Sequence, residues 1–285
     1  MKVASVIVTF NPDIPQFRRV LDSVSDQVSN IKVIDNGSAN IKDIRKLIDD
    51  YADVELIPLN ENFGIAKAQN VGFQILESSA YDWVLTLDQD TVIPLDYIER
   101  LIINTDLKDA AIITGAYIDV KWNESEINSI RVKRKPTIQS ISEEISSGNL
   151  VLVRAWREIG CFDEQLFIDY VDFDFDYRLA EFGYRIYRVN NVEFMHEIGS
   201  PVKKGFFARM LFLNKHEVFD HSAFRMFYLF RNRLIVRKRH PQFGSPIRML
   251  IREVLNLREI LIMEGPRFQK MQAAVHGIIK GITGK

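Results

Sequence analysis

The amino-acid sequence predicts an α/β fold: a mostly parallel central sheet with helices on both faces, followed by a helical C-terminal region. Three observations lead to this prediction. Short apolar, β-rich runs alternate with segments of helical periodicity over residues 3–118, as in βαβ units. A cluster of polar residues follows each of four such runs. From about residue 206 to the end, the pattern is helical and basic.

The elements of the front part follow in close succession. Residues 3–10 form a continuous apolar run that ends at Asn11 and Pro12, which predicts a buried strand entering a loop. By the same patterns we expect strands at 30–38, 54–60, 83–90 and 110–118, and helices at 14–28, 41–51, 65–78 and 93–104. Right-handed connections would collect these strands into one sheet.

The pattern is less regular after this point. Residues 121–147 are polar, mixed in charge and weakly periodic, and we interpret them as a connecting loop or an excursion with strands. Gly148 and Asn149 open another apolar run, and residues 184–189 form a further strand candidate.

Charge divides the chain into two parts. Residues 203–285 hold 17 Lys and Arg against 5 Asp and Glu, whereas residues 1–202 hold 20 against 33. The length fits one large domain, or one domain with an appendage, and with this charge division we expect a domain at 1–202 and a basic, mainly helical region at 203–285. An acidic front part suits metal binding, and a basic tail suits phosphates, an anionic membrane or nucleic acid.

Cysteine content and hydropathy indicate the compartment. The single cysteine, Cys161, cannot form an internal disulfide, which fits a reducing environment. No apolar run approaches the ~18 residues that span a bilayer. The N-terminal apolar stretch is short and has no signal-peptide cleavage site, so we interpret it as the first strand. We expect a cytoplasmic protein.

Polar clusters end four predicted strands. In open α/β sheets, ligands bind beyond the carboxyl ends of the strands. Polar residues are common in loops, but four successive clusters favour a nucleotide site. They are Thr9-Phe10-Asn11, Asp35-Asn36-Gly37, Asn60-Glu61-Asn62 and Asp88-Gln89-Asp90.

The last cluster has the chemistry of a metal site. In an extended segment Asp88 and Asp90 would point to the same side, where two carboxylates can hold Mg²⁺ together with substrate phosphates. His196 could add a nitrogen ligand or a hydrogen bond to phosphate. A solvated turn and a structural histidine are the alternatives.

A second acidic cluster lies at residues 163–178, where aspartates alternate with apolar and aromatic residues. Carboxylates among aromatic rings lose solvent, which raises their pKa and strengthens them as bases. The alternative is an amphipathic segment whose acidic face meets water.

These motifs together resemble the inverting family 2 glycosyltransferases, which have the Rossmann-like A-type fold. Within them the chain is most similar to bacterial rhamnosyltransferases that use dTDP-rhamnose. The Gln in Asp88-Gln89-Asp90, followed by Thr91, is similar to the form typical of those enzymes. The matching stretches are 6–12, 33–38, 60–72, 85–90, 146–152, 167–179 and 194–200.

The resemblance implies a role for each matching position. The base and ribose pocket would be lined by Thr9, Phe10, Asn11, Asp35 and Asn36, and Asn62, Gly64 and Lys67 would lie along the nucleotide. The nucleotide's ribose and Mg²⁺ or Mn²⁺ would bind Asp88 and Asp90, and His196 would complete the metal site. The donor sugar and acceptor would lie beside Gly148, Asn149 and Asp169. Lys67 would reach the diphosphate.

The family's catalytic base usually follows a Glu, and this sequence has Val171 at that place. Asp172 is therefore our first candidate for the base, with Asp169 and Asp174 behind it.

The basic tail matches the family loosely. At residues 225–239 aromatic and basic side chains interleave, with Phe227, Phe230 and Leu234 on one side. This suits a helix at an anionic membrane surface, on the inner face of the plasma membrane. A helix packed on the catalytic domain, with its basic face in water, is the alternative. Nucleic acid fits poorly, because no recognition motif accompanies the basic residues.

The expected activity is metal-dependent transfer of a sugar, L-rhamnose from dTDP-L-rhamnose. The acceptor would be a saccharide or lipid-diphosphate-linked saccharide of bacterial cell-surface polysaccharide synthesis. The alternatives are a UDP-sugar donor, a sugar nucleotidyltransferase and a non-catalytic nucleotide-sugar-binding scaffold. A nucleotidyltransferase should have a Gly-rich phosphate loop after its first strand, where this chain has Thr9-Phe10-Asn11-Pro12.

Overall fold

The computed structural model describes residues 2–134, 136–196, 199, 201–202, 205–213 and 217–284. The chain forms two compact units: Met1–Phe167 with Val171–Glu197, and Ile168–Tyr170 with Ile198–Lys285. Three positions of the 194–200 motif, Glu197, Ile198 and Ser200, lie outside the described residues. So does Lys203, the expected start of the basic region.

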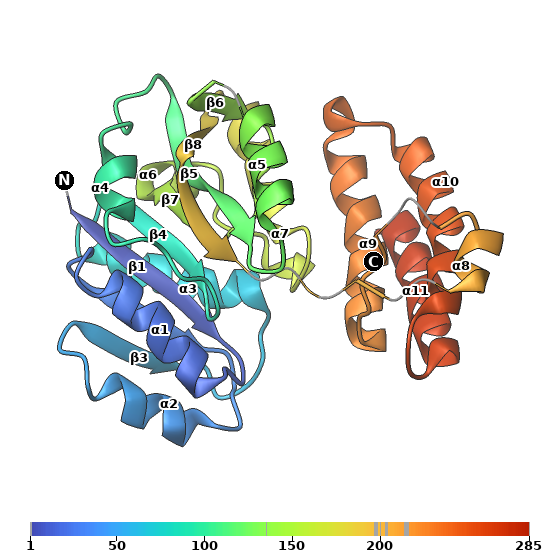
Figure 1. Ribbon diagram of the computed structural model, residues 1–285, viewed down its shortest axis with the longest axis horizontal. Helices are drawn as coiled ribbons and strands as arrows, with labels where there is room; N and C mark the ends of the chain where they lie inside the picture. Colours follow the sequence, from blue (N-terminus) through green and yellow to red (C-terminus); the bar gives the residue numbers. More distant parts are fainter. Residues whose placement is uncertain are drawn as a thin grey trace. The chain divides into compact units, whose positions relative to one another are not determined.

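The first unit is built on one sheet (Figure 1). Within the described residues it has eight strands in the order β3-β2-β1-β4-β7-β5-β8-β6. Their bounds are β1 Val3–Thr9, β2 Ile31–Asp35, β3 Val54–Pro58, β4 Trp83–Asp88, β5 Ala110–Asp119, β6 Ile138–Ile141, β7 Asn149–Leu152 and β8 Arg185–His196. Strands β3, β2, β1 and β4 are parallel, as are β5 and β8. Strand β7 runs antiparallel between β4 and β5, and β6 runs antiparallel to β8.

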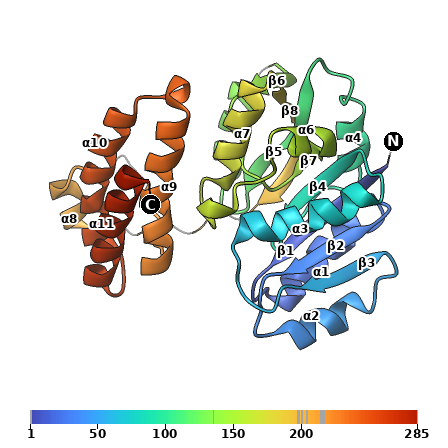
Figure 2. The same cartoon turned by 180° about the vertical axis from the view of Figure 1, so that it is seen from behind.

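Helices cover both faces of this sheet (Figure 2). On one face lie α1 (Ile14–Val24), α2 (Ile41–Ile48) and α4 (Tyr97–Ile102), whose apolar residues join a continuous core with β1 and β4. On the other face lie α3 (Ile65–Ser78), α6 (Val153–Glu158) and α7 (Val171–Glu181). The Phe73 ring there lies 5.1 Å from Trp156 and 5.4 Å from Phe162. The predicted α/β layering is confirmed.

Strand β1 shows why helix α3 lies close to the sheet. Its odd-numbered residues Val3 and Ile7 belong to the core under α1, whereas Val6 faces α3. A Cβ at Gly72 would lie 2.6 Å from the Val6 side chain, so glycine is what permits this approach. The close packing places the first turn of α3 beside the carboxyl edge of the sheet.

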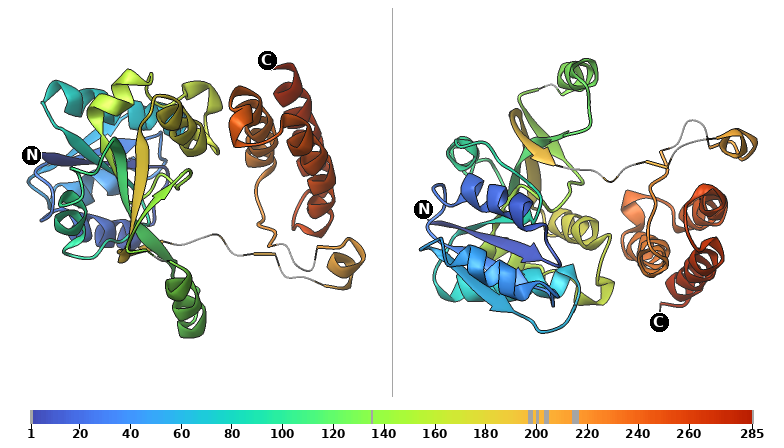
Figure 3. Two further views of the ribbon diagram at one scale, coloured as in Figure 1. Left: turned by 90° about the horizontal axis from the view of Figure 1, so that it is seen from above. Right: turned by 60° about the horizontal axis from the view of Figure 1, so that its bottom comes forward.

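The interpretation of residues 121–147 as loop or strands was incomplete. They form helix α5 (Glu124–Lys133) as well as β6, and α5 projects from the sheet in both views of Figure 3. No described residue of α5 is buried, so it has no apolar face for a sequence pattern to reveal. Its start is set by a capping box, in which Asn123 and Glu126 each satisfy the other's backbone N–H.

The second unit is helical. Its elements are α8 Phe206–Met210, α9 Ala223–Arg239, η2 Pro241–Phe243, α10 Pro246–Asn256, η3 Leu257–Ile262 and α11 Arg267–Thr283. Phe230 and Leu234 of α9 are buried against Ile260 and Ile278. The prediction that these two residues form a membrane-facing side of the helix was therefore wrong, because they form the core of their unit. None of the helices in the described part of the chain has the length and apolar composition to cross a bilayer.

Candidate active site

The carboxyl ends of β1 and β2 are joined by a buried hydrogen-bond network. The Thr9 hydroxyl donates to Asp35 Oδ1 over 3.1 Å, and the Ser38 N–H donates to Asp35 Oδ2 over 3.0 Å. Thr9 and Asp35 are buried. The parallel register, which pairs Thr9 with Asp35, brings these two predicted residues together. Asp35 is thus held in one orientation by protein contacts on both oxygens.

Two asparagines continue this edge. Asn36 Nδ2 donates to Asn62 Oδ1 over 3.0 Å, and Asn36 Oδ1 accepts the N–H of Phe63 over 2.9 Å. Asn11, a further predicted residue, is exposed, and its Oδ1 accepts the N–H of Ala39. The sequence prediction missed Phe63. Like Phe10, it is an exposed aromatic residue at this edge, 43% against 45% exposed, and its position beside Asn62 was the available signal.

The N-terminus of α3 lies against the segment around Phe167. Gly64 has a φ of 86°, and a Cβ there would lie 2.5 Å from the Phe167 carbonyl oxygen. The N–H of Ile65 donates to that same oxygen over 2.8 Å. Lys67, in the first turn of the helix, forms an ion pair with Glu164 at 3.3 Å.

Asp88, Asp90 and His196 converge at the end of β4. One ligand atom of each lies within 4.8 Å of the others, and all three residues are partly exposed. Strand β4 ends at Asp88, so a turn and not an extended segment brings Asp90 beside it. An isolated bridge between Val92 and Met195 places the end of β8, and with it His196, next to this turn. Two carboxylates and an imidazole fit Mn²⁺, and the carboxylates fit Mg²⁺.

The middle residue of the triplet has a structural contact that was not predicted. Gln89 Oε1 accepts the N–H of Phe10 over 2.8 Å, and Gln89 Nε2 lies 3.4 Å from the Phe10 carbonyl oxygen. A single side-chain amide thus fixes the backbone after β1 to the turn after β4. It holds the carboxyl end of β1 next to the group formed by Asp88, Asp90 and His196.

Gly148 and Asn149 lie where β7 begins, next to β4 and β5. Gly148 has a φ of 84°, and a Cβ there would lie 2.7 Å from the Phe194 ring. Asn149 Nδ2 donates to the Ile145 carbonyl, whereas its buried Oδ1 has no hydrogen-bond partner among the described residues. This segment is therefore tightly packed and still has an unused acceptor.

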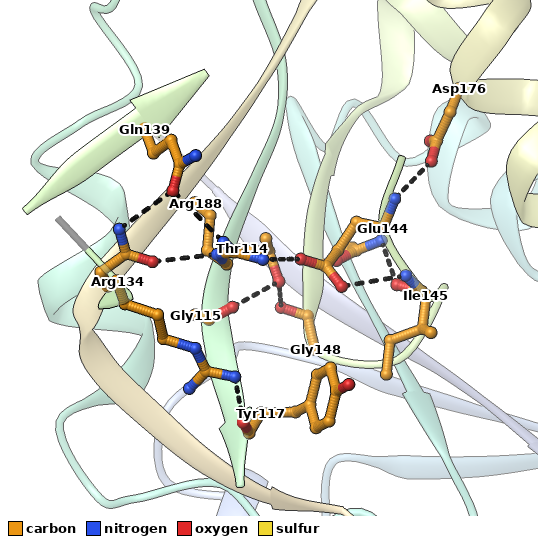
Figure 4. Close-up of polar contacts among 12 residues, drawn as sticks. Thr114, Gly115, Tyr117, Arg134, Gln139, Glu144, Ile145, Gly148, Asp176 and Arg188 are labelled. Carbon is orange, nitrogen blue, oxygen red and sulfur yellow. Dashed lines mark hydrogen bonds and ion pairs between the residues drawn. The ribbon is translucent and has the colours of Figure 1, made fainter. Parts of the chain in front are cut away.

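A buried polar group supports the same segment (Figure 4). Glu144 lies between Arg188, 3.4 Å from its carboxylate, and Asp176, whose carboxylate accepts the Glu144 N–H over 2.8 Å. Burial raises the pKa of Glu144, and the Arg188 charge opposes that rise. Burial raises the pKa of Asp176 well above its ordinary value, and the nearby Asp172, Glu144 and Glu143 charges add to the rise.

The three candidate bases have different surroundings. Asp174 is buried and pairs with Arg178 at 2.8 Å. In the second unit, Asp169 receives a bidentate contact from Arg225, with Nη2 2.8 Å from Oδ1 and Nε 3.1 Å from Oδ2. Asp172 is partly exposed in the first turn of α7, where its Oδ1 accepts the N–H of Phe173.

Solved structures with a similar fold place this architecture in a class. The GalNAc-T7 crystal structure with UDP, GalNAc and Mn²⁺ matches with a TM-score of 0.56 and 13% identity, over 90% of this chain and 57% of that chain. The S. aureus TarS 1–349 structure matches with a TM-score of 0.53 and 14% identity, over 100% of this chain and 92% of that chain. The fold is the A-type glycosyltransferase fold, as the sequence predicts.

The family follows from the sequence comparison. Residues 5–157, more than half of the chain, match the model of glycosyl transferase family 2, and the chain belongs to this family. It is 28% identical over 295 residues to the dTDP-rhamnosyl transferase RfbF of Shigella flexneri, covering 99% of this chain and 96% of that protein. The chain is a glycosyltransferase, which sets aside the sugar nucleotidyltransferase.

Proposed function

We propose that this protein is a metal-dependent, inverting rhamnosyltransferase. It would move L-rhamnose from dTDP-L-rhamnose to a saccharide or lipid-linked saccharide in the synthesis of a bacterial cell-surface polysaccharide. The observation that supports this most is the group of Asp88, Asp90 and His196 at the tip of β4, beside the polar ends of β1 and β2. The similarity to a dTDP-rhamnosyl transferase supports the donor.

The ends of β1 and β2 would bind the nucleotide. Asp35 and Asn36 are buried and fixed by hydrogen bonds, which favours specific recognition of a base over loose contact. Phe10 and Phe63 offer exposed aromatic surface to a base. Lys67 would exchange its contact with Glu164 for the donor's diphosphate, which carries more charge.

A divalent cation, Mg²⁺ or Mn²⁺, held by Asp88, Asp90 and His196 would neutralise the diphosphate as it leaves. Asp172 would accept the proton of the acceptor hydroxyl. The acceptor oxygen then bonds to the anomeric carbon, the bond from that carbon to the diphosphate oxygen breaks, and its electron pair leaves with the diphosphate. Gly148 and Asn149 would border the sugar, with the unused Asn149 Oδ1 as an acceptor for a hydroxyl.

The second unit would bind an anionic membrane surface, where lipid-linked acceptors lie. Helix α10, and not α9, has the suitable face. Its residues Ile247, Ile251 and Val254 are all more than 50% exposed, with Arg248 and Arg252 exposed beside them. An apolar helix face edged with arginines fits an interface of lipid and water. We therefore place the enzyme at the cytoplasmic face of the membrane.

The test is donor hydrolysis, which needs no acceptor. The purified chain is incubated with dTDP-L-rhamnose or with UDP-sugars, in Mn²⁺ or in EDTA, and released nucleoside diphosphate is measured. We expect slow release from dTDP-L-rhamnose in Mn²⁺ only. Asp90→Asn should reduce it to the EDTA level, and Asp172→Asn should reduce it by about 100-fold or more without weakening donor binding.

Asp96→Asn is the matched control, because this exposed aspartate lies near the turn but outside the site, and its release should equal that of the wild type. Release from a UDP-sugar alone would overturn the proposed donor. No release from any nucleotide-sugar, with the protein folded, would overturn the proposed function as a whole.

A further inference from the structure

Two buried hydroxyl groups connect the candidate metal ligands. The backbone N–H of Asp88 donates to Ser147 Oγ over 2.9 Å. Ser147 Oγ lies 2.8 Å from Thr91 Oγ1, and Thr91 Oγ1 lies 2.9 Å from His196 Nδ1. Thr91 is 0% exposed and Ser147 is 1% exposed. A continuous hydrogen-bonded chain therefore runs from the end of β4 to the end of β8.

This chain determines which imidazole nitrogen is available. Because Nδ1 of His196 is engaged by Thr91, Nε2 is the nitrogen left for a ligand. A histidine that binds a metal through one nitrogen usually donates its other N–H to an oxygen, which fixes the tautomer and the ring orientation. Threonine Oγ1 has two lone pairs, so it can accept that hydrogen bond as well as the one that the Ser147 hydroxyl donates to it, while Ser147 Oγ accepts the Asp88 N–H.

The burial of these hydroxyl groups needs a reason, because apolar side chains of the same size would fill the same space. A buried hydroxyl is tolerated only when it is hydrogen-bonded. Valine at position 91 would be close in volume, yet the protein has threonine there, bonded to the histidine.

We propose that Thr91 and Ser147 are positioning residues that hold His196 with Nε2 toward Asp88 and Asp90. This inference rests on the proposed metal-dependent function. In the cation-bound state Nδ1–H of His196 donates to Thr91 Oγ1, which also accepts the hydrogen bond of the Ser147 hydroxyl. Since Ser147 also accepts the Asp88 N–H, these hydrogen bonds fix both the backbone of Asp88 and the ring of His196.

The experiment measures Mn²⁺ binding rather than turnover. Mn²⁺ is titrated into the full chain in the presence of dTDP, and free Mn²⁺ is followed by electron paramagnetic resonance. We expect Thr91→Val to weaken Mn²⁺ binding by about 10- to 100-fold. Thr91→Ser keeps the hydroxyl, so its Mn²⁺ affinity should lie within about threefold of the wild type. Ser147→Ala should weaken Mn²⁺ binding, as Thr91→Val does. Electron spin-echo spectra of bound Mn²⁺ should show a nitrogen coupling in the wild type and in Thr91→Ser that Thr91→Val weakens and His196→Gln removes.

Thr105→Val is the control. The Thr105 hydroxyl donates a hydrogen bond to the Ile102 carbonyl but takes no part in the hydrogen bonds between Asp88, Ser147, Thr91 and His196. Its Mn²⁺ affinity should equal that of the wild type. Wild-type affinity and unchanged nitrogen coupling in Thr91→Val would overturn the inference while leaving the proposed function in place. Absence of Mn²⁺ binding by the wild type would instead overturn the metal dependence itself. Should Thr91→Val fail to fold, wild-type affinity in Ser147→Ala would overturn the inference.

Discussion

At the scale of single residues, Asp176 shows how the protein arranges its carboxyl groups. Its side chain is buried in α7 and accepts the N–H of Glu144. Burial is the largest cause of its raised pKa, so the group stays protonated at a pH where an exposed aspartate is ionised.

The raised pKa predicts a pH-dependent stability. A carboxyl group whose pKa is higher in the folded state contributes stability below its unfolded pKa, near 4, and this is lost as the pH rises through the folded pKa. Asp176→Asn keeps the acceptor for Glu144 but cannot ionise. At pH 8 the wild type loses stability because Asp176 is ionised in the unfolded state, and Asp176→Asn avoids this loss. We expect the melting temperature of the variant to exceed that of the wild type at pH 8, by about 2–4 °C for each kcal/mol of stability regained. At pH 4 the difference should be much smaller.

The control for this measurement is Asp174→Asn, which removes a buried partner of Arg178 and should destabilise the protein at pH 8. Parallel curves of melting temperature against pH for the wild type and Asp176→Asn would show that Asp176 ionises freely in the folded state.

The site residues differ in how far the sequence predicts them. Asp88, Asp90 and His196 belong to motifs whose residue types alone indicate metal binding. Gln89, Thr91 and Ser147 act through hydrogen bonds between segments distant in the sequence, such as the contact of Gln89 with Phe10. Such contacts depend on which strands are neighbours, and no local pattern contains that information.

At the scale of elements, the junction between Gly64 and Phe167 is tightly constrained. Gly64 has a φ of 86° and the nonglycine residue Phe167 has a φ of 64°, a region that costs L-residues energy. These two residues lie next to each other where α3 begins, and the carbonyl oxygen of Phe167 accepts the N–H of Ile65. The strained segment thus satisfies a backbone donor in the first turn of the helix that carries Lys67.

Gly64→Ala should therefore weaken both stability and donor binding. The added Cβ would lie 2.5 Å from the Phe167 oxygen, in addition to the cost of about 1–2 kcal/mol for the positive φ. We expect a lower melting temperature and weaker binding of dTDP, measured by calorimetry. Gly160→Ala is a matched control: Gly160 has a φ of 90° but no atom within 4 Å of the added Cβ. Equal losses in both variants would show that backbone strain alone, and not the clash, matters.

Most element types were predictable, and their ends were less so. The alternation of apolar runs and helical spacing gave the order of elements from β1 to β5, and the helix expected at 65–78 has those bounds in the structure. The helix expected at 93–104 is limited to Tyr97–Ile102. Helix α5 could not be predicted, because a helix that buries no residue has no apolar periodicity.

At the scale of the whole molecule, charge and hydropathy are distributed unequally. Residues 203–285 have 12 more Lys and Arg than Asp and Glu. Helix α10 directs Glu253, buried and 3.3 Å from Arg233, toward its unit, while Ile247 and Ile251 face outward. Burial raises the pKa of Glu253, and the Arg233 charge opposes that rise. A helix whose carboxylate is buried and whose isoleucines are exposed is suited to the surface of an anionic membrane, which combines apolar acyl chains with negatively charged headgroups.

Membrane binding follows as a prediction. Vesicles of phosphatidylglycerol and phosphatidylcholine should bind the protein in sedimentation assays, less as salt is raised, and vesicles of phosphatidylcholine alone should bind it weakly. Ile247→Ser with Ile251→Ser should reduce binding, and Arg248→Gln with Arg252→Gln should cost about 1 kcal/mol per charge. Ile103→Ser, an equally exposed isoleucine of the first unit, should have no effect. Equal binding to neutral and anionic vesicles would argue against electrostatic attachment.

The sequence by itself determined the α/β layering, the buried first strand and the residue types at the strand ends, because periodicity and strand-terminal chemistry are local properties. The tertiary structure alone decided that a turn and the bridge from Val92 to Met195 bring the predicted metal ligands together, that Arg225 pairs with Asp169, and that Phe230 and Leu234 are core residues. These contacts depend on strand order, register and helix packing, which arise from the whole chain burying its apolar surface at once.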